Sequence, residues 1–133
     1  MHKTALSFDV SMWEVFWPLL NGSTIYVLNE GLESDFEAVS KAVFMQQVTV
    51  LHFVPTMLEL FLDQTDAHSL QSLRQVYCSG EVLFPTTVQK FNECFAATSQ
   101  LPRLTNLYGP TEAAIDVSVF DTSASENLSQ IPI

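Results

Sequence analysis

The spacing of apolar residues along the chain predicts four helices. Apolar residues recur at helical spacing within 12–20, from Phe36 to Val43, within 57–63 and from Pro85 onward. The first stretch ends at Asn21-Gly22, a pair that often terminates a helix because glycine accepts the left-handed conformation. Capping boxes, Ser34 with Glu37 and Thr56 with Glu59, mark the predicted starts of the second and third helices.

Short apolar and β-branched runs between these helices predict five strands. They lie at Ser23–Leu28, Val48–Val54, Arg74–Ser79, Leu104–Leu107 and Ala113–Phe120. Alternation of strands and helices favours right-handed crossovers, so we expect an α/β fold with a mostly parallel sheet covered by helices. Ligands of such sheets bind beyond the carboxyl ends of the strands.

Composition and charge narrow the classes of partner. At 133 residues, with 47% apolar residues, the chain is at most one domain and can form a real core. The net charge of −10 argues against nucleic acid or an anionic membrane as the main partner. No apolar run approaches the ~18 residues of a membrane helix. Cys78 and Cys94 fit neither a metal spacing nor a secreted disulfide framework, so we expect a cytoplasmic protein.

The seven residues from Asn106 to Glu112 carry the groups needed to hold a nucleotide. The ring of Tyr108 can stack on a base, and Gly109 lets the backbone approach a ligand closely. Thr111 can donate a hydrogen bond to a phosphate oxygen, and Glu112 can bind a hard cation such as Mg²⁺.

A second motif, Phe8-Asp9-Val10-Ser11-Met12-Trp13-Glu14, lies far upstream. Together the two motifs resemble the adenylate-forming (AMP-binding) enzymes, and within them the amino-acid adenylation domains of nonribosomal peptide synthetases. The resemblance implies a ligase of secondary metabolite biosynthesis that uses ATP and Mg²⁺ to turn an α-amino acid into an aminoacyl-adenylate. It also implies a carrier-protein domain as partner, whose phosphopantetheine thiol accepts the acyl group.

The resemblance covers nearly all of the chain but only part of such a domain. It implies that the phosphate loop lies before Met1, and that the ribose-binding aspartate and the catalytic lysine lie after Ile133. Residues 1–133 are therefore expected to be part of the large N-terminal domain of the fold, truncated at both ends. Such a fragment is expected to be inactive by itself.

Residue by residue, the resemblance implies a nucleotide site made of Gly80, Glu81, Asn106, Tyr108, Gly109 and Thr111. The first two would lie along the base, and the asparagine and tyrosine would bind and stack on the adenine. Thr111 and Glu112 are the expected catalytic residues, the threonine touching the α-phosphate and the glutamate holding Mg²⁺ between the phosphates. The structural alternatives are a plain strand-to-turn junction at 77–81 and a capped turn at 109–112.

The resemblance also implies a substrate wall, formed by Asp9, Val10, Trp13, His52, Tyr77, Ser79, Leu107, Ile115 and Asp116. In this family the matching aspartate, here Asp9, pairs with the α-ammonium of the substrate, because an unpaired buried charge is very costly. Relatives that activate acyl or aryl acids have no ammonium to bind and generally lack it. The structural alternative for Asp9 is a helix N-cap.

The wall mixes bulky residues with three polar ones, which are His52, Ser79 and Asp116. Buried polar groups need partners, so the substrate side chain should be small and should carry a hydrogen-bonding group. The wall is similar to those of serine-activating domains, so L-serine is the expected substrate and threonine the near alternative. His52 as a satisfied core histidine and Asp116 as a surface residue at a strand end stay open.

Two other functions stay open at this point. One is an acyl-CoA or aryl-acid ligase of the same superfamily, which Asp9 and the polar wall disfavour. The other is a non-catalytic α/β interaction module, which nothing in the sequence excludes. The flanking coding sequence would discriminate an enzyme from such a module, since an enzyme of this family needs the phosphate loop and the downstream lysine.

Overall fold

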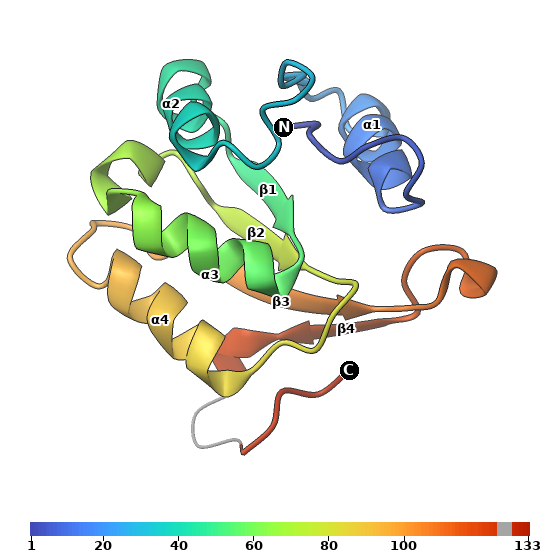
Figure 1. Cartoon of the computed structure of the whole chain (residues 1–133). Helices are drawn as coiled ribbons and strands as arrows, with labels where there is room; N and C mark the ends of the chain where they lie inside the picture. The colour runs from blue at the N-terminus through green and yellow to red at the C-terminus, as the bar shows by residue number, and fades with distance from the viewer. Residues whose placement is uncertain (125–128) are drawn as a thin grey trace.

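The computed structural model describes residues 1–124 and 129–133, and these form a four-stranded sheet in the order β1-β2-β3-β4 (Figure 1). The strands are β1 Val50–Phe53, β2 Gln75–Cys78, β3 Arg103–Tyr108 and β4 Ser118–Asp121. The first three strands are parallel, and β4 pairs antiparallel with β3. The predicted α/β class with a mostly parallel sheet is thereby confirmed.

The predicted helices are also present. They are α1 Ser11–Leu20, α2 Phe36–Gln46, α3 Pro55–Gln64 and α4 Pro85–Phe95, with short 3-10 turns η1 Ala67–Leu70, η2 Thr111–Ala113 and η3 Thr122–Ala124. Proline occupies the first turn of α3 and α4, where its missing N–H leaves no hydrogen bond unmade. Gly22 follows α1 with a φ of 64°. Among the described helices, none is both long and apolar enough to cross a membrane.

Three local predictions are wrong. Ser23–Leu28 is no strand, since a single parallel bridge from His2 to Val27 gives it too little pairing. Asp35, rather than Ser34, caps α2 by accepting a hydrogen bond of 3.0 Å from the N–H of Ala38. Thr56 does not cap α3, which begins at Pro55; its hydroxyl instead donates to Glu81.

The predicted strand at Ala113–Phe120 is shorter than expected and differently placed. Its first part belongs to η2 and to the connection that follows, and β4 begins only at Ser118. The segment 109–117 therefore joins β3 and β4 as a hairpin connection, which explains the antiparallel pairing of β4. Asp116 lies in this connection and not at a strand end.

The two faces of the sheet carry different helices. Phe53 packs against Phe61 of α3 with ring centroids 4.9 Å apart, whereas the ring of His52 contacts Trp13 of α1 at 5.6 Å. Since successive strand residues point to opposite faces, α1 lies on the face opposite α3. Figure 1 shows α3 and α4 side by side over one face, with α1 set apart from them.

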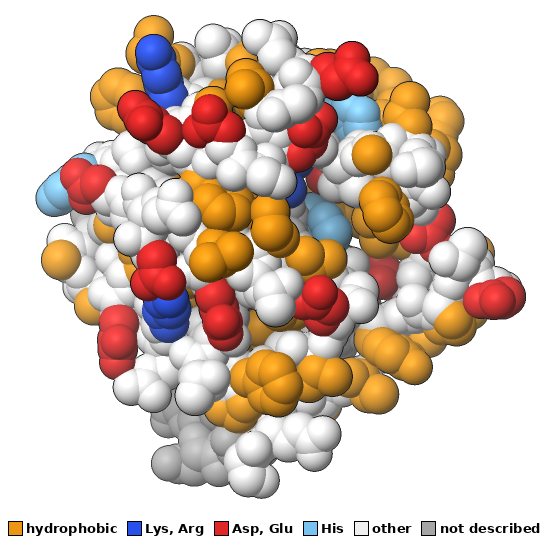
Figure 2. All heavy atoms as spheres, in the orientation of Figure 1, with side chains coloured by type: hydrophobic (Ala, Val, Ile, Leu, Met, Phe, Trp, Pro, Cys, Tyr) orange, Lys and Arg blue, Asp and Glu red, His pale blue; other side chains and the backbone are white. Residues whose placement is uncertain are grey.

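Acidic side chains dominate the charged surface. Figure 2 shows them scattered over the visible face, with few basic side chains among them. This distribution follows from 15 acidic and 5 basic residues in the chain.

Candidate functional site

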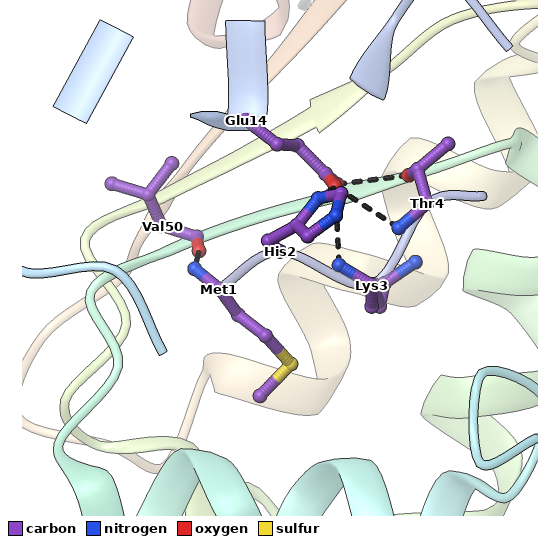
Figure 3. A network of polar contacts seen from close by, with 6 residues as sticks. All are labelled: Met1, His2, Lys3, Thr4, Glu14 and Val50. Carbon is purple, nitrogen blue, oxygen red and sulfur yellow. Dashed lines mark hydrogen bonds and ion pairs between the residues drawn. The ribbon is translucent and has the colours of Figure 1, made fainter. Parts of the chain in front are cut away.

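A buried carboxylate fastens α1 to the N-terminal segment (Figure 3). Oε2 of Glu14 accepts hydrogen bonds from Nδ1 of His2 at 2.9 Å and from the backbone N–H groups of Lys3 at 3.1 Å and Thr4 at 3.0 Å. Its Oε1 accepts a fourth from the hydroxyl of Thr4 at 2.9 Å. The nitrogen of Met1 donates to the carbonyl of Val50 in β1 at 3.1 Å. The segment thus ties the helix to the edge of the sheet.

This network keeps Glu14 ionised although the residue is only 3% exposed. Burial alone would raise the pKa of its carboxyl, but the hydrogen bonds from Thr4 and His2 and the charge of Lys3 outweigh burial and lower the pKa. Glu14 is not among the predicted site residues. The available signal was an acidic residue within an otherwise apolar helix.

Three aromatic rings meet where α1 crosses the sheet. Trp13 lies 6.0 Å from Trp17 and 5.3 Å from Tyr77 of β2, and Trp17 lies 5.9 Å from Tyr77, all as centroid distances. These rings line a cavity of about 250 Å³ together with Leu107, Ala114, Ile115 and Asp116. Five predicted wall residues therefore share this cavity, namely Trp13, Tyr77, Leu107, Ile115 and Asp116. Trp17 and Ala114 line it without having been predicted.

The remaining predicted wall residues line a second, larger cavity of about 790 Å³. They are Asp9, Val10, His52 and Ser79, and Gly80 and Glu81 of the predicted nucleotide site line it as well. Trp13 lines only the smaller of these two cavities, but its ring also contacts His52, which lines the larger one. The structure thus distributes the nine predicted wall residues over two cavities rather than one.

Asp9 has one oxygen paired and one left over. Its Oδ1 accepts a hydrogen bond of 2.8 Å from the N–H of Val10, while Oδ2 is buried and has no hydrogen-bond partner among the described residues. The residue is not the N-cap of α1, since Val10 takes that position and no side chain caps the helix. A buried carboxylate oxygen without a partner is costly, and a bound cation would supply the missing donor.

Asp116 lies within electrostatic reach of Asp9. Burial raises the pKa of the Asp116 carboxyl, and the negative charge of Asp9 raises it further. Two carboxylates in this arrangement favour a cation between or beside them, because it relieves their repulsion. An ammonium group with hydrogen-bond donors fits such a site.

His52 and Ser79 satisfy each other. Nε2 of the histidine and Oγ of the serine lie 2.8 Å apart, and both residues are buried. Burial first, and the charge of Lys3 second, lower the pKa of His52 to about 4, so the ring is neutral near pH 7. Nε2 of the histidine is therefore paired within the protein, and the residue also lines the larger cavity.

The end of β3 separates two sets of predicted residues. Asn106 and Tyr108 alternate with Leu107, so they point to the opposite side of the strand from the substrate wall. The amide of Asn106 donates to the carbonyl of Pro132 at 2.8 Å, whereas its buried Oδ1 has no partner among the described residues. Tyr108 is 48% exposed, which leaves its ring open for stacking.

The connection after β3 folds back tightly on itself. A Cβ at Gly109 would lie 2.5 Å from the carbonyl oxygen of Ile115 and 2.6 Å from Cα of Asp116, so glycine is needed here for space. Ala114 and Ile115 have φ values of 61° and 83°. For a β-branched residue such as isoleucine this is a strained conformation, of a kind that clusters at functional sites. The strained turn carries Ile115 and Asp116 back to the cavity wall.

Thr111 and Glu112 lie exposed in η2, at the tip of this connection. In the described part of the chain, no group of three or more His, Cys, Asp or Glu side chains could hold a metal ion. Glu112 fits a magnesium site only as a single carboxylate that shares the ion with phosphate oxygens and water, which is a common way for proteins to hold Mg²⁺. Glu81 accepts a hydrogen bond of 2.6 Å from the hydroxyl of Thr56.

Comparison with known proteins relates this chain to one family of enzymes. Residues 1–132 match the family described as AMP-binding enzyme. The chain is 40% identical over 137 residues to a component of the plipastatin synthase of Bacillus subtilis (strain 168), covering 100% of this chain and 4% of that protein. The chain thus spans a small part of the relatives it matches.

Solved structures with the same fold are similar over almost the whole chain. The adenylation domain AlmE of Vibrio cholerae, in complex with glycyl-adenosine-5'-phosphate, has a TM-score of 0.81 and 29% identity, over 98% of this chain and 24% of that one. The nonribosomal peptide synthetase FmoA3, in its α-methyl-L-serine-AMP bound form, has a TM-score of 0.84 and 26% identity. That match covers 98% of this chain and 15% of FmoA3.

Proposed function

This chain belongs to the AMP-binding enzyme family, and we propose on that premise that it is part of an amino-acid adenylation domain of a nonribosomal peptide synthetase. In the parent protein the carboxylate of the amino acid would attack the α-phosphorus of ATP. A new P–O bond forms, the bond to the β-phosphate breaks, and pyrophosphate leaves. The aminoacyl group would then pass to a carrier-domain thiol, and AMP would leave.

The observation that carries this proposal is the unpaired buried oxygen of Asp9. An α-ammonium group would donate to Oδ2, and the nearby charge of Asp116 would favour the same cation. On the other side of β3, Asn106 and Tyr108 would hold the adenine, with Gly80 and Glu81 along the base. Thr111 would donate to the α-phosphate, and Glu112 would hold Mg²⁺, which would supply charge neutralisation to the phosphates.

Within this function we propose L-serine as the substrate. Asp116 lines the smaller cavity and can accept a hydrogen bond from the substrate hydroxyl, whereas His52 and Ser79 line the larger cavity and are bonded to each other. The aromatic rings opposite favour a small side chain. The ligands of AlmE and FmoA3, a glycyl and an α-methyl-L-serine adenylate, also carry small amino acids.

Pyrophosphate exchange by the full-length parent domain tests this assignment. We expect serine to be the best substrate, threonine to follow, and alanine to be weak, since a site that binds a hydroxyl rejects an analogue without it by up to roughly 10⁴–10⁵. Asp116→Ala should reduce the preference for serine over alanine. Asp63→Asn, which alters an exposed carboxylate on α3, should leave it unchanged. A preference for alanine or a large apolar amino acid would contradict serine.

A further inference from the structure

Trp17 closes a triangle of rings in the smaller cavity, although neither sequence motif includes it. Its ring lies at 65° to that of Trp13 and at 72° to that of Tyr77, and these two are inclined by 76° to each other. All three contacts are edge-to-face, the arrangement that aromatic rings favour. We call Trp13, Trp17 and Tyr77 the ring triangle.

The ring triangle is a stiff part of the cavity wall. Trp13 and Trp17 are four residues apart on α1, so both project from the same side of the helix. The Glu14 network ties that helix to β1 through the N-terminal segment, and Tyr77 lies in β2, which pairs with β1. A longer substrate side chain would have to separate rings that support one another, and this would weaken its binding.

Trp17 also differs from a core residue. It is 42% exposed, while its inner part lines the cavity, so the packing of the sheet does not depend on it as it does on Phe53 or Phe61. Shortening this side chain should therefore enlarge the cavity more than it weakens the fold.

We propose that Trp17 is a specificity-determining residue that limits the depth of the amino-acid pocket. This role of Trp17 rests on the proposed function, because it requires that the substrate side chain enter the smaller cavity. Through the ring triangle, Trp17 excludes side chains longer than those of serine and threonine. Its role is steric, whereas Asp116 recognises the hydroxyl.

The test compares serine with homoserine, which keeps the hydroxyl and adds one methylene, in the full-length parent domain. Trp17→Ala should raise the homoserine-to-serine ratio of kcat/KM by at least about tenfold, the lower end of what a pocket gains from excluding one methylene. Trp17→Phe should raise it less. Phe16→Ala is the matched control, since Phe16 is the neighbouring exposed aromatic of α1 and lines neither cavity.

An unchanged ratio in Trp17→Ala would overturn the proposal, and so would an equal rise in Phe16→Ala, which would indicate general loosening of α1. Thermal melts of each variant identify such loosening. If Trp17→Ala does not fold, the ratio in Trp17→Phe decides. If the wild-type domain prefers an amino acid other than serine, the serine assignment fails separately, and Trp17 is then tested with that amino acid and its homologue longer by one methylene.

Discussion

His52 and Ser79 are 27 residues apart in the sequence, yet their side chains form a buried hydrogen bond of 2.8 Å. The bond joins β1 to the residue that follows β2, at the carboxyl ends of two parallel strands. It pairs with each other two polar side chains that the sequence alone offers to a ligand. In the proposed substrate pocket, polar recognition is therefore expected to depend mainly on Asp9 and Asp116.

Acid should destabilise the parent domain through His52. Between its ordinary pKa of 6.5 and its folded value of about 4, the unfolded chain binds a proton that the folded chain does not. The free energy of unfolding should therefore fall as the pH drops through this window, by about 2 kcal/mol on reaching pH 5. Urea unfolding at about pH 7 and about pH 5 measures this loss. The free energy of unfolding of His52→Asn should fall less between these pH values than that of the wild type. For His68→Asn, which alters an exposed histidine, it should fall as much as for the wild type.

Asp9→Ala should greatly weaken the activation of every α-amino acid. The ammonium would lose its partner, and truncating one member of a buried charge pair costs about 2–5 kcal/mol. Steady-state kinetics of the parent domain would show the loss in kcat/KM, with a thermal melt to verify folding. A variant with nearly normal kcat/KM would mean that Asp9 has only a structural role.

Glu112→Gln should increase the Mg²⁺ concentration needed for adenylation while leaving the fold intact. Glu112 is exposed, so its loss removes a metal ligand and little packing. We expect an increase of at least about tenfold, the loss that even outer partners of a metal site produce. Mg²⁺ titrations of activity are compared with thermal melts. Glu37→Gln, an exposed glutamate of α2, serves as control, and equal titrations for wild type and Glu112→Gln would refute metal binding.

Gly109→Ala should displace the hairpin connection that carries Ile115 and Asp116. The added Cβ would press on backbone atoms at 2.5 and 2.6 Å, which cannot yield as a flexible side chain would. We expect a destabilisation of about 1–3 kcal/mol and a higher KM for the amino acid. Gly22→Ala is a useful comparison, because it strains a positive φ but has open space around it. Its KM should stay at the wild-type value; a rise equal to that of Gly109→Ala would argue against a local effect on the pocket.

Glu14→Gln should loosen α1. The amide offers only one oxygen to the donors of His2, Lys3 and Thr4, so buried donors are left unpaired. Each unpaired donor lowers the free energy of unfolding by about 1–3 kcal/mol. The pKa of Glu14 in the folded protein is lower than its ordinary value of 4.5. The stability that Glu14 contributes is therefore present above pH 4.5, and it is lost as the pH falls through the pKa of the folded protein. That window begins lower than the window of His52. Measuring the free energy of unfolding across both pH ranges separates the contributions of Glu14 and His52. If this free energy falls as steeply for Glu14→Gln as for the wild type below pH 4.5, the stabilising role of the Glu14 carboxylate is contradicted.

Much of the fold was predictable because its signals are local. Pro85 marks a helix start, Asn21-Gly22 ends α1, and the apolar run of β1 indicates a buried parallel strand. The strand predicted at Ser23–Leu28 is absent because a strand needs a partner along its length, and His2 supplies only a single bridge. Only the first part of Ala113–Phe120 was mispredicted, because Gly109 lets the chain fold back closely where the residue types alone favour an extended chain.

The chemistry of the two motifs follows from the sequence by itself, since residue types and short spacings determine which groups are present. Tertiary structure alone decided which of those groups are already satisfied. The hydrogen bond between His52 and Ser79, the donors around Glu14 and the entry of Trp17 into the pocket wall all depend on how the strands pair and how α1 packs across the sheet. Such contacts join residues far apart in the chain, so they are set by packing geometry and burial rather than by any local pattern.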